Sequence, residues 1–383
     1  MAASPRTLVD GIEIVDYRKL RIERLLGQGA FGQVHVAHCS HPKVTNPVVI
    51  KRMNQPVDDK VRKLFMKEAK LLSHLHHENV IRMYGICEGP LVIILEYVFF
   101  DFKPFLNRKI EVNSVDKFLS EISKLPTLVA ERLNDLIPTI ASDITRGLSY
   151  LHNLEIAHRD LKPLNVLISN QHYCDLEDTQ ELERLKSVRP VICKLADFGE
   201  SRSQMVQTNR INDPSTNQGW RGTIPFMAPE ILLPEGLDRE RKLSLDDLKK
   251  VDIWALGLVF YCLVNPSVSF PYEREASNLQ DLMMLHRQRR HPSADPSYQP
   301  KHATVWSRVH DAFQFCTKHN PTERPSASRV LVVLHAHHPA SRHATGKFGY
   351  LHVHALSVDI KNSASLIAAK PPGFSGDYYR LRT

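Results

Sequence analysis

Hydrophobic positions in the first hundred residues follow two different periods. Strand-like runs occur at "RIERLLGQG" (21–29), "FGQVHVAH" (31–38) and "NPVVIK" (46–51), and in the second of them β-branched residues alternate with other types. In the next segment, 58–80, the apolar residues have helical spacing: they are Val61, Leu64, Phe65, Leu72 and Leu75. The pattern therefore predicts three β-strands followed by one amphipathic helix.

The later part of the chain has a helical pattern. Six apolar residues recur at helical spacing and should face the core: Ile137, Ile140, Ala141, Ile144, Leu148 and Leu151. The longest apolar run, "IWALGLVFYCLV" (253–264), is too short to span a bilayer and is typical of a buried core helix. These patterns predict two buried helices in the later part of the chain.

One carboxylate interrupts the apolar stripe of the first helix. Glu68 lies three and four residues after Phe65 and Leu64, on the same face. A carboxylate there is costly unless it is paired, or unless it sits at the edge of the stripe and reaches solvent. Lys51, at the end of the third strand-like run, is the natural partner.

Composition changes this picture only slightly. The formal charge of the 383-residue chain is +8, but Lys and Arg are scattered. We interpret the charge as a solvated basic surface and expect no nucleic-acid partner. The six cysteines form no C-x-x-C pair, which predicts neither a zinc site nor a disulfide framework and favours a reducing compartment.

The first residues, "MAASPRTLVDGIEIVDY", contain no apolar signal core. We therefore expect a soluble cytoplasmic protein with no membrane span; nuclear access is left open. The oligomeric state is not indicated.

The glycines of "GQGAFGQV" (27–34) match G-x-G-x-x-G, a pattern shared by two nucleotide-binding architectures. A dinucleotide-binding loop needs a helix after the last glycine and an acidic residue about 20 positions later. Here a strand-like run follows, and no Asp or Glu occurs between Glu23 and Asp58. The pattern instead favours a hairpin whose backbone N–H groups meet phosphate oxygens, with Lys51 adding a positive charge.

Further motifs follow in a fixed order. They are "HRDLKPLN" (158–165), "DFG" (197–199), "APE" (228–230), "DIWALG" (252–257) and "PTERP" around Arg324. With these motifs the chain resembles the eukaryotic protein kinase family over roughly residues 17–337.

The resemblance implies an α+β, bilobal fold. A small β-rich N-lobe with one key helix would occupy about 17–96, and a larger, mainly helical C-lobe about 101–337. Residues 1–16 would be an N-terminal extension, and 338–383 a tail of unknown structure.

The resemblance also implies ATP and Mg²⁺ as cofactors and a protein substrate with a reactive hydroxyl. Phosphoryl transfer needs positioning and charge neutralisation more than covalent help. Asp160 would orient the substrate hydroxyl, and Lys162 would place a positive charge beside the γ-phosphoryl group. Lys51, held by Glu68, would bind the α- and β-phosphates.

The resemblance implies roles for further residues that match motif positions of the family. Asn165 and Asp197 would hold Mg²⁺ through hard oxygen ligands. The lid over the phosphates would consist of Gly27, Gln28, Gly29, Ala30, Phe31 and Gly32. Around adenine, Val34 and Val49 would form the roof, Leu167 the floor, and the backbones of Glu96 and Val98 the polar edge, with Leu95 controlling access to the back pocket.

Three residues resemble scaffold positions of the family. Glu230 and Arg324 would form a buried ion pair that anchors the activation segment, and Asp252 would brace the catalytic loop through its backbone. Arg159 resembles an arginine that pairs with a phosphate on the activation loop, where the hydroxyl candidates are Ser203, Thr208, Ser215 and Thr216. We favour Thr216 or Thr208.

Two alternatives stay open. Kinase-like folds can lose catalysis and serve as binding scaffolds, although Lys51, Glu68, Asp160, Asn165 and Asp197 are all present here. The acceptor is the second question. Lys162 with Pro163, and Thr223, resemble serine/threonine kinases, and "FMAPE" resembles the tyrosine-kinase-like group, so we expect Ser/Thr specificity with dual or tyrosine specificity as the alternative.

Two segments are longer than the family requires. We expect 107–135 to be an enlarged helix-loop after the hinge, and 171–190 to loop out between two short strands with an exposed, charged surface. The sequence does not identify the physiological substrate or the upstream activator.

Overall fold

The computed structural model describes residues 8–9, 11–28, 32–54, 59–198, 224–233, 243–294 and 303–336 of the chain. Residues 338–383, for which the sequence suggests a tail, lie outside these ranges.

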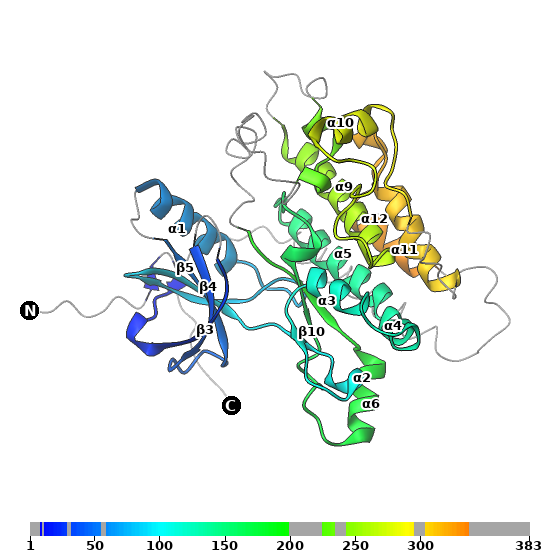
Figure 1. The fold of residues 1–383 in the computed structure, drawn as a ribbon. Coiled ribbons are helices and arrows are strands. Elements are labelled where there is room, and N and C mark those ends of the chain that lie inside the picture. Colours follow the sequence, from blue (N-terminus) through cyan, green and yellow to red (C-terminus); the bar gives the residue numbers. More distant parts are fainter. Residues whose placement is uncertain are drawn as a thin grey trace, which may run out of the picture. The chain divides into compact units, whose positions relative to one another are not determined.

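The first part of the chain forms a five-stranded antiparallel sheet with the strand order β3-β4-β5-β7-β6 (Figure 1). The strands are β3 (Leu20–Gln28), β4 (Gly32–Cys39), β5 (Val48–Met53), β6 (Met83–Glu88) and β7 (Leu91–Glu96). The three strand-like runs of the sequence correspond to β3, β4 and β5, which confirms that prediction. Lys51 lies inside β5 and not at its end, because pairing with β7 continues through Arg52.

One helix, α1 (Asp59–Ser73), packs on this sheet against β6 and β7. Its buried face includes Phe65, Ala69 and Leu72, and Leu75 is buried just after the helix ends. The predicted amphipathic helix is therefore confirmed, and Figure 1 shows α1 lying against the sheet.

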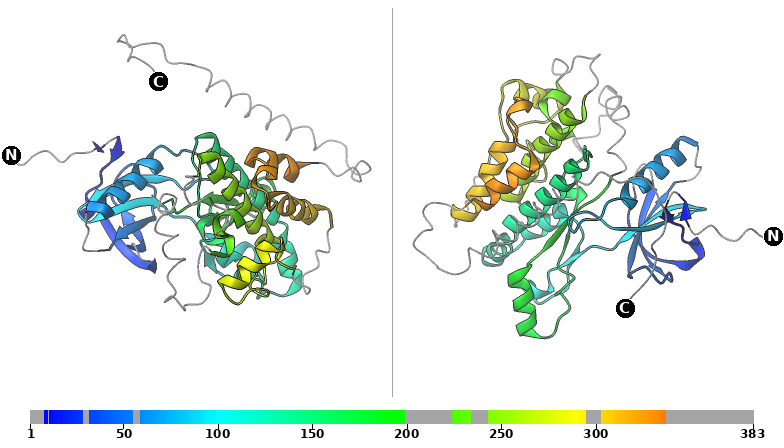
Figure 2. Two further views of the ribbon diagram at one scale, coloured as in Figure 1. Left: turned by 90° about the horizontal axis from the view of Figure 1, so that it is seen from above. Right: turned by 180° about the vertical axis from the view of Figure 1, so that it is seen from behind.

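The second part of the chain is mainly helical, and Figure 2 shows it from two further directions. Its long helices are α5 (Ile137–Asn153), α9 (Leu245–Val264), α10 (Leu279–Arg287), α11 (Ala303–Cys316) and α12 (Ala327–His335). Helix α9 contacts α5 and α11, and α12 covers α5. All six residues of the predicted stripe on α5 are buried, and so is the whole apolar run of α9.

Helix α9 begins at a capping box. Ser244 Oγ accepts a hydrogen bond from the backbone N–H of Asp247, and the Asp247 carboxylate accepts one from the backbone N–H of Ser244. These reciprocal bonds satisfy backbone donors that a helix start leaves without partners.

A small hairpin of β8 (Phe100–Asp101) and β9 (Glu111–Val112), with α2 (Lys103–Leu106) between its strands, leads into the first long segment. Within 107–135 the structure has β9 and two helices, α3 (Val115–Ile122) and α4 (Thr127–Asn134), as expected for an enlarged helix-loop.

The second long segment lies between two short paired strands, β10 (Val166–Ser169) and β11 (Ile192–Leu195), as predicted. However, it is not only a loop, because it contains helix α6 (Thr179–Val188). Asp178 caps this helix by accepting hydrogen bonds from the N–H groups of Gln180 and Glu181. Several of the charged residues that suggested an exposed loop belong to this helix: one caps its start, and others form ion pairs at i,i+3 spacing along it.

The sheet with one helix and the mainly helical part together confirm the predicted α+β, bilobal fold. Among the helices in the described ranges, none has the length and apolar character needed to cross a membrane.

Candidate active site

Lys51 and Glu68 form the ion pair that links the sheet to α1. Lys51 Nζ lies 2.9 Å from Glu68 Oε1. Lys51 is held in β5 opposite Val34 of β4 and Ile93 of β7. Glu68 is only 8% exposed, so the carboxylate on the apolar face of α1 is paired rather than directed to solvent.

Lys51 also reaches the second lobe, because its Nζ lies 3.2 Å from Asp197 Oδ1. Burial alone would lower the pKa of Lys51, but the charges of Glu68 and Asp197 outweigh burial and raise that pKa. Desolvation raises the pKa of Asp197, whereas the charge and hydrogen bond of Lys51 lower it below its usual value. Lys51 is therefore a cation and Asp197 an anion.

The β10–β11 hairpin explains why Asn165 and Asp197 are close together. Val166 pairs with Leu195, and the backbone N–H of Ala196 donates to the carbonyl of Asn165 at 2.9 Å. The residues just before β10 and just after β11 are therefore neighbours. Asp197 has a positive φ of 61°, a conformation seldom adopted outside turns and functional sites.

Asp160 is buried, with 2% of its surface exposed, and its two carboxylate oxygens differ. Oδ2 accepts hydrogen bonds from Lys162 Nζ at 2.8 Å and from Asn165 Nδ2 at 2.9 Å. Oδ1 has no hydrogen-bond partner among the described residues. A buried acceptor without a donor is costly, so Oδ1 of Asp160 is an atom that can accept a hydrogen bond from a bound group.

Asp252 of α9 holds the backbone of the loop 158–165, which contains Asp160. Its two oxygens accept from the N–H groups of His158 and Arg159, both at 2.7 Å. His152 at the end of α5 adds a third contact, with Nε2 3.0 Å from Asp252 Oδ2. The sequence indicated Asp252 but not His152. A histidine in the last turn of a helix carries no signal of a partner 100 residues later.

Glu230 and Arg324 form a bidentate ion pair at 2.6 and 2.7 Å. The Arg324 side chain is fully buried, donates to the carbonyls of Lys250 and Lys318, and lies over the ring of Trp254. This pair fixes α8 (Pro229–Leu232) to the loop between α11 and α12.

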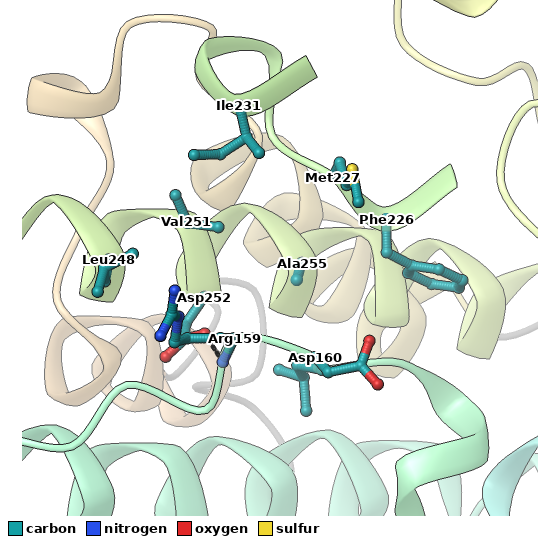
Figure 3. Close-up of a pocket in the computed structure, with 10 residues that line it drawn as sticks. Arg159, Asp160, Phe226, Met227, Ile231, Leu248, Val251, Asp252 and Ala255 are labelled. Carbon is teal, nitrogen blue, oxygen red and sulfur yellow. Dashed lines mark hydrogen bonds between the residues drawn. The ribbon is translucent and has the colours of Figure 1, made fainter. Parts of the chain in front are cut away.

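A mostly apolar pocket lies between the loop 158–165, α8 and α9 (Figure 3). It is lined by Arg159, Asp160, Leu161, Phe226, Met227, Ile231, Leu248, Val251, Asp252 and Ala255. Figure 3 shows Asp160 and Phe226 at one end of the pocket and Leu248 at the other.

The residues assigned to the nucleotide lie around the junction of the two lobes. Val34, Val49 and Leu167 are half-buried in β4, β5 and β10, and Val98 is buried after β7. The Glu96 carboxylate pairs with Lys194 at 2.9 Å, which leaves only its backbone for the role that the sequence suggested. Their contact with adenine remains a prediction.

The glycines of the lid differ in their surroundings. A Cβ on Gly32 would collide with the carbonyl oxygen of Arg52, so only glycine fits where β4 meets β5. Gly27 has open space around it. Gly29, Ala30 and Phe31 lie outside the described residues, as do Gly199, Thr223 and the four activation-loop hydroxyls, Ser203, Thr208, Ser215 and Thr216.

The donor set at Asn165 and Asp197 fits Mg²⁺. Asn165 Nδ2 donates to both the carbonyl and the carboxylate of Asp160, so Oδ1 is the Asn165 atom that can bind a cation. An amide oxygen and an ionised carboxylate are hard ligands of the kind that Mg²⁺ prefers.

Comparison with known proteins agrees with this geometry. The family model described as "Protein kinase domain" matches residues 20–335. The chain is 27% identical to the high affinity nerve growth factor receptor of Gallus gallus over 81% of its length, and 24% identical to the dual specificity protein kinase splA of Dictyostelium discoideum over 84%. It is 27% identical to the leucine-rich repeat serine/threonine-protein kinase 1 of Caenorhabditis elegans over 82% of its length.

The chain spans only 34%, 12% and 12% of the length of these three relatives, respectively. The likeness therefore concerns one domain of each. Because the family model matches most of the chain, from the glycine lid to the last described helix, the protein belongs to the protein kinase family.

Proposed function

We propose that this protein is an active kinase that transfers the γ-phosphate of ATP to serine or threonine hydroxyls of proteins. The observation that carries the proposal is the state of Asp160. Lys162 and Asn165 fix one of its oxygens, while the other has no donor among the described residues. A substrate hydroxyl would supply the missing donor.

In the proposed reaction, Asp160 Oδ1 accepts a hydrogen bond from the substrate hydroxyl and directs its oxygen at the γ-phosphorus. The bond from that oxygen to phosphorus forms as the bond to the β–γ bridging oxygen of ATP breaks, and the hydroxyl proton passes to Asp160. Lys162, already 2.8 Å from Asp160, adds positive charge beside the transferring group.

Lys51 would bind the α- and β-phosphates, because it is a cation with Glu68 on one side and Asp197 on the other. Asn165 and Asp197 would hold Mg²⁺, which neutralises phosphate charge when it is bound. When ATP binds, phosphate oxygens would take the place of Asp197 as the second partner of Lys51. The Lys51–Glu68 pair would remain as it is.

The preference for Ser/Thr rests on Lys162, which contacts Asp160, and on Pro163 after it. The names of the relatives do not decide the acceptor, since they include a tyrosine-protein kinase, a dual specificity kinase and a serine/threonine kinase. Dual or tyrosine specificity is the alternative. Phosphoamino-acid analysis of a phosphorylated protein mixture separates them: phosphoserine and phosphothreonine support the proposal, and phosphotyrosine alone contradicts it.

An inactive, nucleotide-binding scaffold is the rival function. The full chain should phosphorylate a generic protein substrate with Mg²⁺ and ATP, and an Asp160→Ala variant should not. Equal incorporation by both proteins, or none by either, would count against an active kinase.

A further inference from the structure

A short segment that precedes the kinase match extends the sheet of the first lobe. Strands β1 (Leu8–Val9) and β2 (Ile12–Glu13) form a small hairpin, drawn in dark blue in Figure 2. The chain then runs parallel to β6: Ile14 bridges Ile86, and the N–H of Val15 donates to the carbonyl of Ile86 at 2.8 Å. Because β6 is the last strand of the five-stranded sheet, the segment covers an open sheet edge. We call Ile12–Val15 the N-terminal strap.

A glycine of β6, Gly85, makes room for the backbone of the strap. A Cβ added to Gly85 would lie 2.6 Å from the carbonyl oxygen of Glu13, closer than real Cβ atoms approach. Glycine at this position therefore lets the two backbones come together. Glu13 is also held from the side by Lys43, whose Nζ lies 3.1 Å from Oε2.

Side chains of the strap alternate between the two faces of the sheet, as they do in a strand. Ile12, 1% exposed, belongs to the main apolar core of the molecule, which also includes Phe65, Ala69 and Leu72 of α1. Val15, 2% exposed, belongs to a separate cluster on the other face, with Cys87 and Ile94. Strand β2 also contacts α1 directly.

The buried face of α1 is the face that carries Glu68. Phe65, Glu68, Ala69 and Leu72 are spaced i, i+3, i+4 and i+7, so they share one side of the helix. Lys51 is fixed within a central strand of the sheet. Helix α1 contacts β6, β7 and β2. Its orientation on these strands therefore decides whether Glu68 reaches Lys51.

We propose that Ile12 is a positioning residue of the kinase: the N-terminal strap seats α1 in the orientation in which Glu68 pairs with Lys51. The effect on catalysis rests on the proposed function above, while the seating of α1 does not. The strap lies before residue 20, where the match to the family begins, so this support is an addition to the matched domain.

The test compares two buried residues of the same strap in the full-length protein. Ile12→Ala removes apolar contact on the α1 side, and Val15→Ala removes it on the opposite side. Both should lower the Tm. Only Ile12→Ala should reduce kcat/KM for ATP, roughly tenfold, as for a typical coupling between sites. Ile12→Leu should keep the activity near that of the wild type.

A second readout does not depend on catalysis. Amide hydrogen exchange across Asp59–Ser73 should be faster in Ile12→Ala than in Val15→Ala. If Ile12→Ala does not fold, Ile12→Val should show smaller changes in the same direction. Equal activity loss in Ile12→Ala and Val15→Ala, or unchanged exchange of α1 in Ile12→Ala, would overturn the proposal. If the wild type transfers no phosphate, the proposed function fails, and the exchange experiment still decides the role of the strap.

Discussion

Glu68 on helix α1 and Lys51 on strand β5 are joined by an ion pair of 2.9 Å in which the carboxylate is buried. The pair connects α1 to the central strand of the five-stranded sheet. It also fixes the ammonium group within 3.2 Å of Asp197 in the other lobe. One carboxylate on an apolar helix face therefore helps to determine where the Lys51 ammonium group lies.

Glu68→Gln should lower kcat/KM for ATP by about a hundredfold, the scale of losing one preorganised charged contact. The neutral amide no longer offsets the burial of Lys51, so the cation is held less firmly. The measurement is steady-state kinetics with ATP varied. Glu88→Gln, an exposed position on β6, is the matched control and should behave as the wild type. An active Glu68→Gln enzyme would show that the pair is only structural.

Asp252→Ala should lower the free energy of unfolding by about 3–5 kcal/mol. It leaves the buried N–H groups of His158 and Arg159 without acceptors, at about 1–3 kcal/mol each, and removes the partner of His152. Urea denaturation measures the change. Asp246→Ala, at an exposed position in the first turn of the same helix, should change stability little. Equal effects of the two substitutions would contradict the bracing role.

A double-mutant cycle should show strong coupling between Glu230 and Arg324. Removing either partner leaves the other without its bidentate contact, and breaking a buried pair costs about 3–5 kcal/mol. The variants Glu230→Gln, Arg324→Met and their combination, followed by denaturant unfolding, give the coupling energy. The exposed Glu181–Arg184 pair of α6 serves as the comparison, and its coupling should be far weaker. Similar coupling in both pairs would refute a special role for the buried one.

His286 should make the protein less stable in mild acid. It is buried, and neither ring nitrogen has a partner among the described residues. Burial lowers its pKa from 6.5 to about 3, with smaller contributions from His319, His291 and Arg324. Because the folded-state pKa is depressed, the unfolded chain binds more protons between those values, and stability falls as the pH falls below 6.5.

His286→Leu removes this titration. Between pH 7 and pH 4.5, the wild type should lose about 3 kcal/mol of unfolding free energy relative to the variant. Denaturant unfolding of both proteins at several pH values gives this difference. A difference independent of pH would mean that His286 is not the buried neutral group that the structure shows.

The sequence predicted the elements that have a strong period. The stripe on α5, the buried run of α9 and the strands β3 to β5 all lie where their patterns placed them. The Lys51–Glu68 contact was also foreseeable, because a charge on an apolar helix face requires a partner.

Other features depend on contacts that no local pattern records. We predicted a loop for the segment that contains helix α6, because the segment is longer than the family requires and is rich in charged residues; the Asp178 cap that starts the helix does not stand out among those charges. The strap was interpreted only as an extension, because four residues that alternate between two faces are too few to stand out. The contact of His152 with Asp252 is set by tertiary packing alone.

The most direct test of the account is the rate of phosphate transfer by Asp160→Asn compared with the wild type, together with their affinities for Mg·ATP. Asp160 is proposed to act on the substrate hydroxyl and not on the nucleotide. The variant should therefore lose about 10²- to 10⁴-fold in kcat, as for a missing general base, while the Kd for nucleotide stays nearly unchanged. Transfer by the variant at the wild-type rate, or a wild type that binds nucleotide but transfers no phosphate, would contradict the central claim.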